Sequence, residues 1–171
     1  FGVRTGEVSL DLSGVHKHKA DVVRRLARGI DHLMKKNAVT VFHGHGRLKG
    51  PGKVEVSGDP GAARVVATKN VVLATGSAPK MLPGMKADGA RVLTSTEALA
   101  LEIVPKRLLI LGAGAVGVEF ASIYARFGSA VTLVEMLPRV LPVEDEEVGA
   151  ELQKAFRKRG IEVRVSTTVE G

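Results

Sequence analysis

The chain has 171 residues, enough for one domain or one and a half, and 44% of them are hydrophobic, which excludes a disordered or low-complexity protein. It contains no cysteine, so disulfides and thiolate metal sites within the chain are excluded. The net charge is +7, but most of the excess lies in residues 16–36; we therefore expect a basic helix face, with no nucleic-acid interface and no membrane contact.

The first part of the chain is predicted to form one helix followed by short strands. Residues 20–36 carry apolar side chains at helical spacing, with charged residues on the other face. Residues 38–48, 53–58 and 63–68 are rich in β-forming residues and are separated by GPG and GDPG turns, which predicts a small antiparallel meander. The apolar run at the start of NVVLATGSAP, residues 70–79, predicts a buried strand of a parallel sheet.

A connection and a short helix follow. Residues 79–90 are rich in proline and glycine and are the best candidate for a link between two domains. Residues 94–101, TSTEALAL, predict a short helix with a Thr or Ser cap and with Glu97 in its first turn. We expect Pro105 to end this helix.

The last part of the chain alternates between strands and helices. Strands are predicted at 107–112, 130–135 and 161–166, and helices at 115–128 and 144–159. A β-α-β-α-β order favours a parallel sheet with right-handed crossover connections. The sequence therefore predicts an α/β fold for this part, with a Rossmann-like parallel sheet.

The stretch GAGAVGVE, residues 112–119, follows a predicted strand and opens a predicted helix. In a dinucleotide-binding unit the first glycine permits the tight turn and the second lets the backbone approach a pyrophosphate. The third lets the helix pack closely on the strand. The pyrophosphate would lie at the helix N-terminus, where backbone N–H groups are available.

An acidic residue ends the next predicted strand at the expected distance from these glycines. The carboxylate of Glu135 is placed to accept hydrogen bonds from ribose hydroxyls, which favours NAD over NADP. Arg139, four residues further on, leaves NADP open, because an arginine there can accommodate a 2′-phosphate. Glu119 has two readings, a carboxylate facing the nicotinamide or a glutamate that favours the helix N-terminus.

The remaining motifs are weaker evidence for a functional site. The histidines of HKH (16–18) and HGH (43–45) have no carboxylate or cysteine partner at ligand spacing, so we expect no metal site. ATGSAP does not match the nucleophile-elbow pattern, and no Ser-His-Asp arrangement is present. We therefore assign no catalytic residue to this chain.

Several stretches in this order resemble the flavoprotein disulfide reductases over nearly the whole chain: NVVLATGSAPKMLPG, TSTEALAL, VPKRLLILGAGAVGVEFASIYARFGSAVTLVE and LPRVLPVEDEEV. The resemblance implies an FAD domain interrupted by an NAD domain. Residues 1–80 would be the C-terminal part of the first FAD-domain segment, including the meander, and residues 81–171 an incomplete NAD-binding domain. It also implies an internal fragment, with the redox cysteine pair and the His-Glu catalytic pair outside it.

The resemblance also implies binding residues for FAD and NAD, position by position. Four residues match positions that approach FAD: Gly46, Thr75, Gly76 and Ser77. The NAD positions are Gly112, Ala113, Gly114, Ala115, Val116, Gly117, Val118, Glu119, Glu135 and Val169. A core valine at a strand end is nearly as good an interpretation of Val169 as a residue that lines the adenine.

For the full-length protein the resemblance implies an oxidoreductase that passes electrons from a dithiol, through a disulfide and FAD, to NAD. TSTEALAL and ARFGSAVTLVE favour the members that act on the lipoyl carrier domain of a 2-oxo acid dehydrogenase complex. Such members imply a homodimer in the bacterial cytoplasm or, in a eukaryote, the mitochondrial matrix. Two alternatives stay open: a sibling similar to mercuric or glutathione reductase, and a dinucleotide-binding module without turnover.

Overall fold

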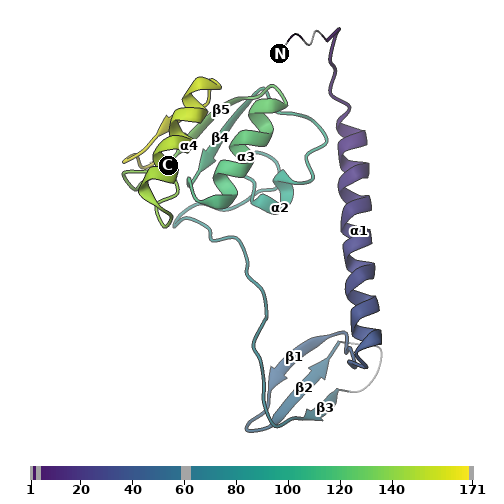
Figure 1. Ribbon diagram of the computed structural model, residues 1–171. Coiled ribbons are helices and arrows are strands. Elements are labelled where there is room, and N and C mark those ends of the chain that lie inside the picture. Colours follow the sequence, from purple (N-terminus) through teal and green to yellow (C-terminus); the bar gives the residue numbers. More distant parts are fainter. Residues whose placement is uncertain (1, 3–4, 59–62, 170–171) are drawn as a thin grey trace. The chain divides into compact units, whose positions relative to one another are not determined.

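The computed structural model describes residues 2, 5–58 and 63–169 (Figure 1). The chain divides into two compact units. One contains the residues up to His16 together with those from Pro79 onward, and the other is Lys17–Ala78. The assignment of one part to FAD and the other to NAD remains a prediction.

Helix α1, Leu12–Lys36, begins earlier than the predicted residue 20. The reason is a cap that the apolar pattern did not show: the Asp11 carboxylate accepts a hydrogen bond from the Gly14 N–H at 3.0 Å, as an N-cap residue does. The same carboxylate accepts from the Ser13 hydroxyl at 2.7 Å. No residue of α1 is buried, and the apolar residues Val23, Leu26, Ile30 and Leu33 are exposed.

An antiparallel meander follows α1, as predicted. Its strands are β1 (His45–Leu48), β2 (Lys53–Ser57) and β3 (Arg64–Ala67), with β2 in the centre. The first strand is shorter than the predicted 38–48, because β2 offers partners only as far as Ser57, which pairs with His45.

Residues 70–79 do not form the predicted buried strand. Val72 is 88% exposed and Leu73 70% exposed. A strand needs a neighbour for its backbone N–H and C=O groups, and within the described ranges no strand pairs with this segment. The prediction was wrong because it inferred a sheet position from apolarity alone.

The parallel sheet is confirmed. Strands β4 (Arg107–Leu111), β5 (Ala130–Val134) and β6 (Glu162–Arg164) pair in parallel in the order β4-β5-β6. Helix α3 (Ala115–Arg126) connects the first two and helix α4 (Glu146–Lys158) the last two. This is the arrangement of one mononucleotide-binding half of a Rossmann fold, whose ligand edge is the carboxyl end of the strands.

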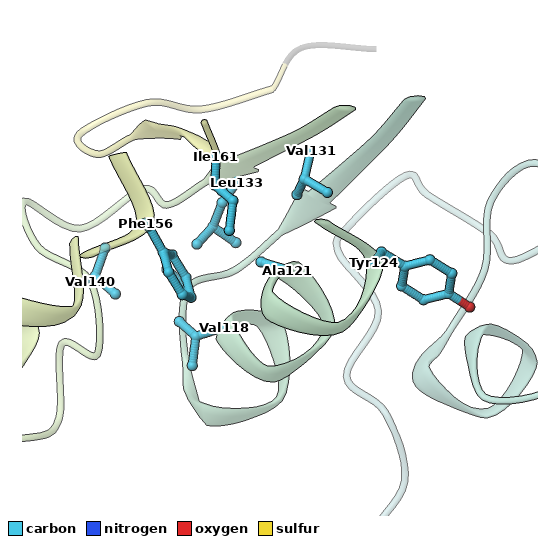
Figure 2. Close-up of a cluster of buried hydrophobic side chains, with 9 residues drawn as sticks. Val118, Ala121, Tyr124, Val131, Leu133, Val140, Phe156 and Ile161 are labelled. Carbon is cyan, nitrogen blue, oxygen red and sulfur yellow. The ribbon is translucent and has the colours of Figure 1, made fainter. Parts of the chain in front are cut away.

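The core of this unit lies between the sheet and its two helices (Figure 2). Alternate residues of β5, Val131 and Leu133, point toward Ala121 of α3 and Phe156 of α4, all four almost fully buried. Val140, from the loop after β5, is also fully buried. This loop is therefore part of the core, which places its backbone next to the turn between β4 and α3.

Helix α2, Ser95–Ala98, begins with the predicted cap. The Thr94 hydroxyl accepts from the Thr96 N–H, and the Glu97 carboxylate accepts from the Thr94 N–H at 2.7 Å. The helix ends well before Pro105, so proline is not its terminator. Instead the Tyr124 hydroxyl donates to the Ala98 carbonyl at 2.6 Å, which ties α2 to α3.

Candidate functional site

The three glycines of the turn between β4 and α3 have three different environments. Gly112 has φ +98°, a left-handed conformation that favours glycine, and its N–H donates to the Val134 carbonyl at 2.8 Å. A Cβ on Gly117 would lie 1.9 Å from the Gly112 carbonyl oxygen. A Cβ on Gly114 would meet no protein atom within 4 Å. The first and third glycines thus serve the fold, and the second leaves a space beside the backbone.

Ala113, between the first two glycines, is fully buried and bonded within the protein through both backbone groups. Its N–H donates to Glu135 Oε2 at 2.7 Å. Its carbonyl accepts from the Leu141 N–H at 2.9 Å. Ala113 therefore shapes the turn and is not available as a donor to a ligand, although the motif places it in the NAD-binding segment.

The N-terminus of α3 lacks a side-chain cap, since its N-cap residue is Gly114. The Val118 N–H makes the first helical bond, to the Gly114 carbonyl at 3.1 Å. The N–H groups of Ala115, Val116 and Gly117 come before it and have no acceptor in the helix. In the described part of the chain, the N-termini of α2 and α4 are capped by Thr94 and Asp145.

An uncapped N-terminus next to an open space has the properties of an anion site. The helix dipole adds positive potential there, and the unbonded N–H groups are donors for oxygen atoms. No side chain or backbone atom would lie within 4 Å of a Cβ on Gly114, so the protein leaves its backbone open on that side. The residues present therefore fit a dinucleotide pyrophosphate.

Glu135 directly follows β5 at the edge of the sheet where the glycine turn lies, and it is 7% exposed. Its Oε2 accepts from Ala113, and its Oε1 accepts from the Leu137 N–H at 2.9 Å. A carboxylate oxygen has two lone pairs, so each oxygen can still accept one further hydrogen bond. Glu135 can therefore support the glycine turn and accept from a ribose hydroxyl together.

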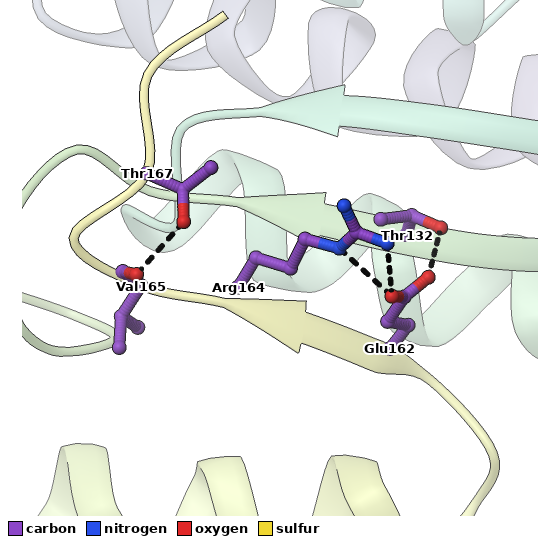
Figure 3. Close-up of polar contacts among 5 residues, drawn as sticks. All are labelled: Thr132, Glu162, Arg164, Val165 and Thr167. Carbon is purple, nitrogen blue, oxygen red and sulfur yellow. Dashed lines mark hydrogen bonds and ion pairs between the residues drawn. The ribbon is translucent and has the colours of Figure 1, made fainter.

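The segment after β6 approaches the same edge. The Thr167 N–H donates to the Glu135 carbonyl at 3.0 Å. The Thr167 hydroxyl turns back to the Val165 carbonyl at 2.9 Å (Figure 3). Val169 follows and is 45% exposed. Val169 lies two residues beyond Thr167, and its contact with an adenine stays a prediction.

A polar network crosses β5 and β6 on the sheet (Figure 3). Glu162 accepts from the Arg164 guanidinium at 2.6 and 2.8 Å and from the Thr132 hydroxyl at 2.9 Å. The hydrogen bond from Arg164, and to a smaller extent that from Thr132, lowers the pKa of Glu162 below its ordinary value. The network orders the exposed surface of the two strands and contains none of the predicted binding residues.

Arg139, the residue that left NADP open, is bonded to its own loop and to the first residue of α4. Its Nη2 donates to the Pro142 carbonyl at 2.9 Å, and its Nη1 lies 3.6 Å from Glu146 Oε2. Glu119 lies exposed on α3, and its role at the nicotinamide also stays a prediction. Sequence reasoning missed Leu141, whose N–H contacts Ala113, because no motif marks that contact.

The predicted FAD residues lie on two separate segments. Gly46 is on β1, where it pairs with Val56. Thr75, Gly76 and Ser77 lie in an exposed stretch without regular secondary structure. Over the described ranges, no hydrogen bond joins the two segments, so the FAD contacts stay a prediction.

The described residues contain neither a metal site nor a membrane-spanning helix. In residues 2, 5–58 and 63–169, no three His, Cys, Asp or Glu side chains gather closely enough to hold a metal ion. None of the helices described for these residues combines the length and apolarity required to cross a lipid bilayer.

The sequence of the chain is similar to a known protein family and to several named proteins. Residues 4–171 match the family described as pyridine nucleotide-disulphide oxidoreductase. A dihydrolipoyl dehydrogenase of Chlorobaculum tepidum is 42% identical over 170 residues, covering 99% of this chain and 36% of the relative. The mitochondrial dihydrolipoyl dehydrogenase of Pisum sativum is 38% identical over 170 residues, with 99% and 34% covered. The chain thus spans about a third of the length of these relatives.

The fold is also similar to that of solved structures. LpdA from Mycobacterium tuberculosis superposes with a TM-score of 0.81 at 27% sequence identity. The match covers 94% of this chain and 36% of that one. The likeness extends over both the meander and the parallel sheet, since little of the chain lies outside it.

Proposed function

Because the chain belongs to the pyridine nucleotide-disulphide oxidoreductase family, we propose that it is the NAD-binding region and part of the FAD-binding region of a dihydrolipoyl dehydrogenase. Relatives with that name match nearly the whole chain. The full-length protein would convert dihydrolipoyl-protein and NAD⁺ to lipoyl-protein, NADH and a proton. The FAD part would be residues 1–80 and the NAD part residues 81–171.

The observation that carries the proposal is the uncapped start of α3 behind the glycine turn, with open space beside Gly114. The N–H groups from Gly114 to Gly117 would bind the pyrophosphate, since those of Gly112 and Ala113 are bonded within the protein. Glu135 would accept hydrogen bonds from the adenosine ribose, Val169 would line the adenine, and Glu119 would face the nicotinamide.

FAD and NAD, when bound, supply the hydride transfer chemistry. Gly46, Thr75, Gly76 and Ser77 would contribute backbone contacts to the FAD. In this proposal the residues of the chain bind and orient, and the redox disulfide and the proton-transfer pair belong to other parts of the protein. The chain contains no cysteine, so it cannot supply such a disulfide itself.

The setting of the whole protein is likewise a proposal. Its partner would be the lipoyl carrier domain of a 2-oxo acid dehydrogenase complex, and it would act as a homodimer. It would function in the bacterial cytoplasm or in the mitochondrial matrix, since relatives include bacterial and mitochondrial enzymes.

The test is isothermal titration of the protein with NADH and with NADPH. We expect tighter binding of NADH, because the Glu135 carboxylate accepts from ribose hydroxyls and repels a 2′-phosphate. Glu135→Ala should bring the ratio of the NADPH dissociation constant to the NADH dissociation constant closer to one. Equal affinities in the parent protein, or a preference for NADPH, would contradict the proposal.

A further inference from the structure

The loop that follows Glu135 contacts the carbonyl group of Ala113 in the glycine turn, whereas the Glu135 carboxylate contacts the N–H group of the same residue. We call residues 136–145 the brace segment. The Leu141 N–H donates to the Ala113 carbonyl at 2.9 Å, while Glu135 holds the Ala113 N–H at 2.7 Å. The two backbone groups of Ala113 are thus fixed by two different parts of the chain. Loss of either contact would leave one of these two backbone groups, in the turn before α3, without its partner.

Leu141 makes this contact in an unfavourable backbone conformation. Its φ is +50°, which for a residue with a Cβ carries an energetic cost. Such conformations persist where the surrounding structure holds them, and they often lie at ligand-binding sites. The brace segment must therefore be held in place by contacts other than its own backbone preference.

Two backbone bonds hold the brace segment, from the Glu144 N–H to the Leu141 carbonyl at 3.0 Å and from the Ser166 N–H to the Leu137 carbonyl at 2.9 Å. Further contacts come from Arg139 and from α4. The guanidinium of Arg139 donates to the Pro142 carbonyl at 2.9 Å and lies 3.6 Å from the Glu146 carboxylate, so it closes the loop across Leu141. On the other side, α4 packs so closely that a Cβ on Gly149 would lie 2.4 Å from the Val140 carbonyl oxygen. Val140 itself is fully buried.

We propose that Arg139 is a positioning residue for the dinucleotide site: it holds the brace segment, and through Leu141 and Ala113 it keeps the glycine turn ready to receive the pyrophosphate. This rests on the proposed NAD function. It also gives Arg139 a role different from that of a 2′-phosphate ligand, since its guanidinium has partners within the chain, Pro142 and Glu146. A residue acting on the turn alters affinity for NADH and NADPH alike, because both carry the same pyrophosphate.

Arg139→Met tests the proposal, because methionine keeps an unbranched side chain and removes all the hydrogen-bond donors. We expect the dissociation constants for NADH and NADPH to rise together, by about threefold to tenfold. A rise of that size follows if the fraction of molecules whose glycine turn can bind the pyrophosphate falls to about a third to a tenth. Arg139→Lys is the conservative control. It keeps the charge and can donate to the Pro142 carbonyl, so its affinities should lie between those of the parent and the methionine variant.

Amide hydrogen exchange at Leu141 provides a readout that does not depend on nucleotide. In the absence of NADH, Arg139→Met should accelerate exchange of the Leu141 amide, while amides of the sheet core, such as that of Leu133, keep their parent rates. Faster exchange everywhere would mean general destabilisation and would overturn a positioning role.

Two other results would also overturn the inference. One is an unchanged Leu141 exchange rate in Arg139→Met. The other is a loss of affinity for NADPH alone, which would make Arg139 a phosphate ligand. If Arg139→Met does not fold, Arg139→Lys gives the same discrimination with smaller changes. If the parent protein binds neither nucleotide, the proposed function fails, and the Leu141 exchange still decides whether Arg139 holds the brace segment.

Discussion

Substituting alanine for each of two glycines in the same turn should separate ligand binding from folding. Gly114 and Gly117 are three residues apart, and a Cβ would have a close neighbour at only one of them. At Gly114 no protein atom lies within 4 Å, and at Gly117 the Gly112 carbonyl oxygen lies at 1.9 Å. We expect Gly114→Ala to weaken nucleotide binding in a stable protein, and Gly117→Ala to destabilise the fold itself.

The expected loss of stability for Gly117→Ala follows from the overlap of atoms. Ordinary contact begins near 3.4 Å, so the new Cβ and the Gly112 oxygen would overlap by about 1.5 Å. The oxygen is a backbone atom and the Cβ is fixed to the backbone, so no rotamer change relieves the clash. Overpacking of this kind costs about 3 kcal/mol. Alanine recovers about 1 kcal/mol of helix propensity relative to glycine, which leaves a net loss of about 2 kcal/mol.

Gly114→Ala should leave the free energy of unfolding almost unchanged. Its φ of −73° and ψ of −177° are accessible to alanine. Alanine is a poorer N-cap than glycine by up to about 1 kcal/mol, and it restricts the unfolded chain by about 0.4–1 kcal/mol in the opposite direction. The two effects offset. The methyl group instead occupies the space proposed for the pyrophosphate, so NADH affinity should fall by about tenfold or more, or ~1.4 kcal/mol.

Urea denaturation and isothermal titration with NADH measure the two quantities on the same preparations. Gly114→Ala should share the denaturation midpoint of the parent and show the weaker binding. If it binds NADH as tightly as the parent, the backbone at Gly114 does not approach the nucleotide and our assignment of the site is wrong. A Gly117→Ala protein with parental stability would show that helix and strand can separate freely.

Two further predictions concern the attachment and the start of α2. Tyr124→Phe should lower the free energy of unfolding by about 1 kcal/mol in urea denaturation, because the Ala98 carbonyl loses its donor; an unchanged midpoint would mean that this bond is replaced by water without loss. Hydrogen bonds from the Thr94 hydroxyl, and to a smaller extent from the Thr94 N–H, lower the pKa of Glu97 below its ordinary value of 4.5. The contribution of Glu97 to stability is therefore present above its unfolded pKa and is lost as the pH falls through the folded pKa. Thr94→Ala should raise that pKa toward 4.5 in an NMR titration of the carboxylate, and the same midpoint in both proteins would disprove the assignment.

The parallel sheet and its glycine turn could be predicted because their signals are local. The turn needs a left-handed residue at Gly112 and a residue without a side chain at Gly117, and the sequence supplies both. Apolar strands on each side of an amphipathic helix then favour a β-α-β unit. The end of α3 is also local: Gly128 has φ +98°, in the position where helices commonly end with glycine.

The features that escaped prediction depend on contacts between distant residues. Whether 70–79 forms a strand depends on a neighbour for its backbone, and its own apolarity cannot supply one. Leucine has no preference for the left-handed conformation of Leu141, and the partner of its N–H group, Ala113, is distant in the sequence. Glu135 was predicted as a ribose ligand, but its bond to the Ala113 N–H could be seen only once both were placed.

The contrast between Gly114 and its two neighbouring glycines has a consequence for how such a sequence can diverge. Gly112 and Gly117 are required by the chain's own geometry, whether or not any molecule is bound. At Gly114 no protein atom requires a glycine, and under the proposed function only the bound nucleotide does. A descendant that lost its nucleotide would be free to replace Gly114 while it retained the other two. Among relatives with this turn, an alanine or a larger residue at the middle position alone would therefore mark a domain that kept its architecture after giving up its cofactor.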